Sequence, residues 1–306
     1  MSSQPFNPRP SYQKPWLSHA DQVAQLVSRG LTVADSAAAE QFLSHVNYYR
    51  FSGYCVAFES QRHQFYGGCT FAQVGAAYEF DMTLRDLVTE ALEVVEVDFR
   101  AAIAYHFGHQ CGAFGHVDSA NFFHRFRHTD WLDQLRDEAV RSSEEFIDHF
   151  RRNYAEYPNL PIWMAMEIMS FGALSKMYKG MVRRDQGPIA RRDGVQPVDL
   201  IAIFHHLVSI RNLCAHHSRL WNRVWAIKPS LPKGQAWRPP QLPSNDRLFG
   251  TLLLLYHLMK RCPAVGPIAI TWRDRIKQHL MNPPSMPDSL AHMGMSQHWD
   301  QHPIWN

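Results

Sequence analysis

Residues 79–107 read EFDMTLRDLVTEALEVVEVDFRAAIAYHF, and they belong to the longest helical pattern in the chain. The pattern opens at Thr70, a residue type that suits a helix N-cap, and runs to Phe107. Its apolar side chains recur every three or four residues, at Phe71, Val74, Tyr78, Val88, Leu92, Val95, Phe99 and Ala102. Because this spacing buries one stripe of a helix, we expect residues 70–107 to form the spine of the fold.

Further helical patterns lie on both sides of this spine. They cover residues 18–29, 34–45, 129–154, 161–183, 197–217, 245–260 and 268–281. The aromatic segment 46–58 is interrupted by Gly53, residues 182–195 (VRRDQGPIARRDGV) predict a charged loop, and residues 228–243 hold too many prolines for a helix or a central strand. No convincing alternating strand pattern is found in the sequence, so it predicts an all-α protein.

The composition is that of an ordinary soluble protein of 306 residues, 45% of them hydrophobic. Lys and Arg number 31 against 28 acidic residues, a net charge of only +3, so any contact with a polyanion must be local. Five cysteines without a C-x-x-C pair favour a reducing compartment. The N-terminus lacks the apolar core of a signal peptide, and the apolar run at Leu252 to Leu255 is too short to span a bilayer. We therefore predict a cytoplasmic protein with no membrane partner.

The most reactive side chains gather in RNLCAHHSRLWNR (211–223), at the end of the helix expected over 197–217. At about 100° per residue, Asn212 and His216 share one face of that helix, while Arg211 lies roughly 140° round from His216 and about 7.5 Å along the axis. One helix does not easily clamp a small group between Arg211 and His216. Two copies packed around a symmetry axis would bring both pairs to one cleft, which predicts a homodimer.

These residue types suit RNA cleavage without a metal or cofactor. A histidine takes the proton from a ribose 2′-hydroxyl or gives one to the leaving 5′-oxygen. An arginine stabilises the charge that grows on the phosphate, and an asparagine orients the phosphate or the imidazole. Such a site leaves a 2′,3′-cyclic phosphate and a 5′-hydroxyl, and it spares DNA.

Structural roles are open for the same residues. Arg, His and Asn near a helix C-terminus commonly satisfy carbonyls and the helix dipole. His205 and His206 lack a carboxylate or cysteine partner at useful spacing, so the sequence predicts no metal site there. His217 is either a second base or a spectator.

The motif and four further blocks, in the same order along the chain, resemble the Abi-like proteins, the abortive-infection family of bacteria that includes the AbiD and AbiF types. RNLCAHHSRLWN resembles the family signature R-N-x-x-A-H-x-x-R-x-W-N. Residues 14–31, 46–54 and 161–178 are similar to its Q-x-x-x-L-x-x-R-G-L, N-Y-Y-R-x-S-G-Y and P-x-W-x-x-x-E-x-x-S-F-G-x-L-S blocks, and residues 79–107 to its long helix.

The resemblance implies a HEPN-type ribonuclease of an antiphage or toxin-like system, marked by R-x(4 to 6)-H. Arg211 and His216 occupy those positions and Asn212 the polar place after the arginine, so these three are the expected catalytic residues. The expected organisation is an arm (1–15), an N-terminal helical segment (16–66), a HEPN-like helical core (67–226), a proline-rich loop with C-terminal helices (227–281) and an irregular tail (282–306). A catalytically silent RNA-binding or regulatory module is the alternative.

Supporting residues are expected elsewhere in the chain. Glu96 and Arg100 form an i, i+4 pair that either stabilises the spine helix or orients the active-site helix, and Glu167 has a similar supporting role. RNA contacts are expected from aromatic and basic side chains. Alternatively, the aromatic residues belong to the core and the arginines to a solvated surface. The candidates are Tyr49, Arg50, Arg183, Arg184, Arg191, Arg192 and Arg219. Restraint by an unknown inhibitory partner or a structured regulatory RNA is also expected, because a free ribonuclease harms the cell.

Overall fold

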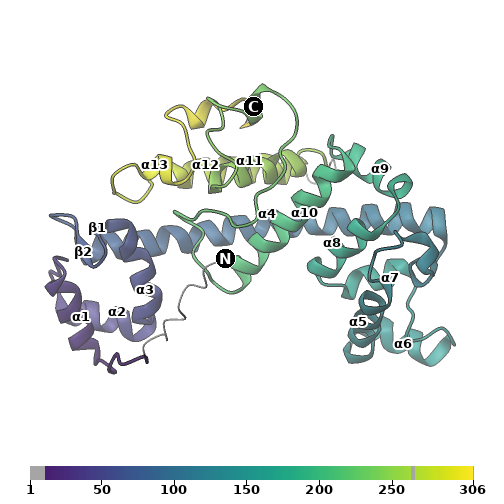
Figure 1. The fold of residues 1–306 in the computed structure, drawn as a ribbon, viewed down its shortest axis with the longest axis horizontal. Coiled ribbons are helices and arrows are strands. Elements are labelled where there is room, and N and C mark those ends of the chain that lie inside the picture. The colour runs from purple at the N-terminus through teal and green to yellow at the C-terminus, as the bar shows by residue number, and fades with distance from the viewer. Residues whose placement is uncertain (1–10, 263–265, 306) are drawn as a thin grey trace, which may run out of the picture. The chain divides into compact units, whose positions relative to one another are not determined.

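The computed structural model describes residues 11–262 and 266–305 and confirms the all-α class (Figure 1). The chain forms two compact units, the first ending at Tyr78 and the second beginning at Glu79. This boundary falls inside the predicted spine, the helix α4 (Phe71–Cys111). Most of the predicted arm, residues 1–10, lies outside the described residues.

The first unit holds three helices that begin with side-chain caps: α1 (His19–Ser28), α2 (Ser36–His45) and α3 (Tyr48–Cys55). Ser18, Asp35 and Asn47 each accept a hydrogen bond from a backbone N–H of the first turn, which satisfies a group that the helix itself leaves unpaired. The helices predicted over 18–29 and 34–45 are thereby confirmed.

Two predictions for the first unit were wrong. Gly53 does not interrupt the aromatic segment, because it lies inside α3, where the buried rings of Phe51 and Tyr54 outweigh a glycine cost of about 1 kcal/mol. An antiparallel hairpin of β1 (Glu59–Gln61) and β2 (Gln64–Phe65) was also missed. Strands of three and two residues are too short to show an alternating pattern.

The second unit contains the remainder of α4 and the helices that follow it. They are α5 (His128–Arg141), α6 (Glu145–Asn153), α7 (Ile162–Ile168), α8 (Phe171–Gly180), α9 (Arg183–Arg192), α10 (Pro197–Ala215), α11 (Leu248–Met259), α12 (Gly266–Leu280) and α13 (Ser289–His292). Two predicted helices are each divided. The pattern 129–154 breaks at Ser142 into α5 and α6, and the pattern 161–183 breaks at Ser170, whose hydroxyl caps α8 by accepting from Ala173 N at 3.2 Å.

The charged segment 182–195 is a helix rather than the predicted loop, since α9 covers most of it and includes Pro188. Tertiary contacts stabilise this helix against its local sequence. The Gln186 amide donates to the carbonyls of Tyr178 and Lys179, and the Tyr178 hydroxyl donates to the Gln186 carbonyl at 3.0 Å. Asp185 and Ile189 are buried on the same side.

Helix α10 carries the predicted reactive residues and lies across α4 in the second unit (Figure 1). Phe204 anchors it, with ring centroids 4.1 Å from Phe99 of α4 and 5.2 Å from Tyr178 of α8. With a mean hydropathy of 1.3, α10 is long and apolar enough to cross a membrane by composition alone. Only 39% of that apolar window is buried within this chain.

His206 ties α10 to two later segments of the second unit. Its Nδ1 donates to the carbonyl of Ile227 at 2.7 Å, and its Nε2 lies 2.9 Å from the Thr251 hydroxyl, which donates to it in the neutral ring. Both ring nitrogens are therefore occupied by hydrogen bonds, which leaves neither for a metal. Burial lowers the pKa of His206 from 6.5 to about 4.

This buried histidine predicts a loss of stability in mild acid. The unfolded ring binds a proton near pH 6.5 and the folded ring only near pH 4, so the stability present above pH 6.5 is lost as the pH falls toward 4. When the pH is lowered from 7.5 to 5, the unfolding free energy should fall in both proteins. The fall should be about 2 kcal/mol smaller in His206→Asn than in the wild type, because the variant lacks this histidine. Urea unfolding at both pH values measures this difference. Equal losses in the two proteins would contradict it.

Candidate active site

The C-terminus of α10 ends in a backbone motif that fixes the direction of the residues after it. Ser218 N donates to Leu213 O at 2.8 Å and His217 N to Cys214 O at 2.9 Å, the two bonds of a Schellman motif. His217 occupies the left-handed position of this motif, with φ of 52°. Glycine is usual there, since a side chain in this conformation costs roughly 1–2 kcal/mol.

His217→Gly is expected to raise the unfolding free energy by about 1 kcal/mol, because it relieves this backbone strain. The RNA cleavage expected from the sequence should persist, since His217 does not line the hollow that His216 lines. Thermal unfolding and an RNA cleavage assay measure the two effects. His217→Asn serves as the control, because asparagine also tolerates the left-handed region. Cleavage as low as in His216→Ala would make His217 part of the catalytic machinery.

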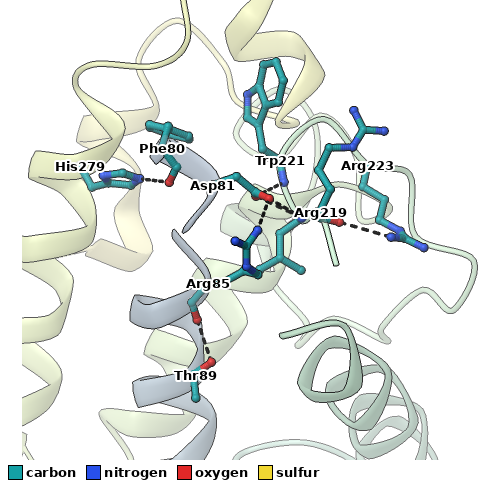
Figure 2. Close-up of polar contacts among 9 residues, drawn as sticks. Phe80, Asp81, Arg85, Thr89, Arg219, Trp221, Arg223 and His279 are labelled. Carbon is teal, nitrogen blue, oxygen red and sulfur yellow. Dashed lines mark hydrogen bonds and ion pairs between the residues drawn. The ribbon is translucent and has the colours of Figure 1, made fainter. Parts of the chain in front are cut away.

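The segment after His217 is held by a buried carboxylate from the spine helix (Figure 2). Asp81 of α4 is fully buried and accepts hydrogen bonds from Leu220 N at 3.1 Å and Trp221 N at 2.6 Å. Arg85, one turn later in α4 and 5% exposed, pairs with the same carboxylate at 2.6 Å. The Asp81 charge is thus matched by a guanidinium and two N–H groups, as a buried charge requires.

Asp81 and Arg85 together anchor the segment that follows His217. Sequence reasoning missed Asp81 and Arg85, although their i, i+4 spacing in the spine was a signal of an ion pair. What the spacing did not reveal is that the pair is buried and reaches across 139 residues to Leu220. Arg219, a predicted RNA contact, lies in the same segment. Its backbone carbonyl accepts a hydrogen bond from the Arg223 guanidinium at 3.3 Å (Figure 2).

His216 and Asn212 open into one hollow of about 310 Å³ along α10. Its remaining lining comes from the same helix face and the segment beyond it: His205, Val208, Ser209, Leu213, Ser218 and Ile227. Asn212 and His216 are both exposed, so a ligand reaches them from solvent. Arg211 is partly exposed and does not line this hollow. A single chain therefore brings together two of the three expected catalytic residues.

The predicted supporting residues lie on other elements. Glu96 and Arg100 form an ion pair in α4, and Arg100 also donates to the Met166 carbonyl of α7. The pair therefore joins α4 to α7 rather than contacting α10 through these bonds. Glu167 is exposed in a groove with Glu144, Glu145 and Glu156, and it does not line the α10 hollow.

The predicted RNA contacts divide between the two units. Tyr49 is 87% exposed and Arg50 is exposed, both on α3 of the first unit. On α9 of the second unit, Arg184 pairs with Asp185 and Arg192 with Asp98. The two other arginines of α9, Arg183 and Arg191, are exposed, and within residues 11–262 and 266–305 no carboxylate lies within 4.0 Å of either.

Comparison with known protein families found a match to the family model described as Abi-like protein, over residues 41–222. That range includes α3, the spine α4, the α9 arginines and the whole R-N-x-x-A-H-x-x-R-x-W-N stretch. Comparisons with curated proteins and with solved structures found no match.

Proposed function

This chain belongs to the Abi-like protein family, whose name associates it with abortive infection, and we propose that it is a metal-independent endoribonuclease of antiphage defence. One observation carries the proposal. Asn212 and His216 open into a common, solvent-accessible hollow at the end of a helix, and the residues that follow are held by Asp81. The R-x4-H spacing of Arg211 and His216 further supports a HEPN-type site.

In the proposed reaction, His216 removes the proton from a ribose 2′-hydroxyl, and the resulting oxygen attacks the adjacent phosphorus. The bond from phosphorus to the 5′-oxygen then breaks, which yields a 2′,3′-cyclic phosphate and, after proton transfer to the leaving oxygen, a 5′-hydroxyl. Asn212, four residues before His216 on the same helix face, orients the imidazole or the phosphate. Arg211 stabilises the charge that develops on the phosphate oxygens.

We propose that the complete site forms between two copies of the chain. Arg211 lies outside the hollow that His216 lines, so a second copy is the natural source of the arginine. Helix α10 has a mean hydropathy of 1.3, 39% of its apolar window is buried within one chain, and Val198 near its start is 57% exposed. An apolar helix that one chain leaves partly uncovered favours a helix–helix interface.

Subunit mixing tests this composite site. Arg211→Ala and His216→Ala proteins are each expected to cut poorly, while their mixture should regain a substantial fraction of wild-type cleavage, because a mixed dimer contains one intact Arg–His set. The readout is cleavage of a labelled single-stranded RNA, with 2′,3′-cyclic phosphate and 5′-hydroxyl ends identified on the products. A mixture no more active than either variant, in confirmed mixed dimers, would mean that each chain carries its own site or none.

A further inference from the structure

A second hollow of the second unit, of about 560 Å³, has an aromatic floor and a cationic rim. The floor contains Phe126, Trp131 and Gly180, and Phe123 stands at the edge with 42% of its surface exposed. It lies between the segment before α5 and the end of α8, and it shares no lining residue with the α10 hollow.

The aromatic floor is held rigidly before any ligand binds. The Phe126 ring stacks on Phe122 with centroids 5.1 Å apart and lies 5.9 Å from the Trp131 ring. It also rests directly on Gly180, where an added Cβ would come within 2.6 Å of the ring. The Trp131 indole N–H donates to the Ala173 carbonyl at 3.1 Å. A ligand therefore meets a preformed surface and incurs little ordering cost.

The rim carries an excess of positive charge. Arg125, Arg127, Lys176 and Lys179 line it, against the single carboxylate of Asp130, which pairs with Arg127. In the part of the chain that the structure describes, Arg125, Lys176 and Lys179 have no carboxylate within 4.0 Å. The exposed lysines at 176 and 179 lie one turn apart on α8, so their ammonium groups face the same ligand.

We propose that this hollow binds an unpaired nucleotide of RNA, with the base against the exposed ring of Phe123 and the backbone phosphate at Lys176 and Lys179. Every base offers a π-face to an aromatic platform, and lysines suit phosphate oxygens. The groove that contains Glu167 has the opposite charge and repels the same ligand. The choice of RNA as the source of the nucleotide rests on the proposed function.

Binding is measured in the His216→Ala background, so that the RNA stays intact. The probe is a fluorescein-labelled single-stranded uridine 12-mer, followed by anisotropy at fixed salt with the full-length protein. Lys176→Glu/Lys179→Glu is expected to weaken binding at least tenfold, and Phe123→Ala about five- to a hundredfold, because a stacked base is lost. The matched control Lys233→Glu/Arg238→Glu changes two exposed cations of the same unit by the same charge and should alter binding less than threefold.

Three outcomes would overturn the proposal. Unchanged binding by both rim and Phe123 variants, with wild-type thermal unfolding, would show that the hollow does not hold RNA. If the control variant Lys233→Glu/Arg238→Glu weakened RNA binding as much as the rim variant, the effect would come from the net charge of the protein and not from the hollow. Displacement of the 12-mer by AMP at the concentration of the oligonucleotide itself would make a free nucleotide the ligand. Loss of binding here is independent of cutting, so failure of the cleavage proposal leaves this result standing, and the reverse also holds.

Discussion

Replacing His216 with alanine is expected to slow RNA cleavage by about 10²–10⁴-fold, the usual contribution of a general acid–base group. The fold should survive, since His216 is exposed and its structural bond, from its backbone N–H to Asn212 O at 3.0 Å, does not involve the side chain. Initial rates on a labelled single-stranded RNA, with thermal unfolding of the same samples, measure both effects.

Arg211→Ala should lower the rate by about 10²–10³-fold, because it removes the group that stabilises charge in the transition state. Arg211→Lys restores the charge but not the planar fork, so we expect only partial recovery. His109→Ala is the control, since His109 is an exposed histidine of the second unit that does not line the hollow. Wild-type cleavage by folded His216→Ala protein would show that His216 is not the catalytic base. Absence of cleavage by the wild-type protein itself would leave RNA binding without catalysis as the function.

Replacing Asp81 with alanine is expected to lower the unfolding free energy of the second unit by about 3–5 kcal/mol. The substitution leaves the buried Arg85 guanidinium without its carboxylate and removes the acceptor for Leu220 N and Trp221 N. A buried charge without its partner costs far more than the intact pair contributes. Urea unfolding followed by circular dichroism measures the loss.

Asp86→Ala is the matched control for this effect. Asp86 lies in the same helix but is exposed, so its loss should change the unfolding free energy by no more than about 0.5 kcal/mol. Asp81→Leu/Arg85→Met replaces both charges with apolar groups and should recover part of the stability, because no buried charge is left alone. If Asp81→Ala were as stable as Asp86→Ala, the buried carboxylate would not be the anchor of the segment after His217.

A milder substitution at Asp81 distinguishes the effect of positioning the segment after His217 from the effect of losing the catalytic histidine. Asp81→Asn keeps one oxygen that accepts the Leu220 and Trp221 N–H groups but loses the charge that matches Arg85. We expect a milder loss of stability than in Asp81→Ala. Cleavage should fall together with stability, whereas His216→Ala loses cleavage alone.

Local sequence signals are enough to predict several of the helices. The spine, the end of α10 near His216 and the shared face of Asn212 and His216 follow from periods of three or four residues and from helix geometry, which neighbouring residues impose. The same rules place Arg211 away from that face, and Arg211 does not line the hollow.

Other features depend on residues far apart in the chain and follow from tertiary packing. The local sequence predicted a loop over 183–192, but the segment is a helix. Hydrogen bonds between Gln186 and Tyr178 and the burial of one side of α9 stabilise it. The burial of Asp81, its bonds to Leu220 and Trp221, and the meeting of Phe126 with Gly180 join segments that are 54 to 140 residues apart. No sequence period encodes such pairings, because they arise when helices pack and bury polar groups that must then find partners.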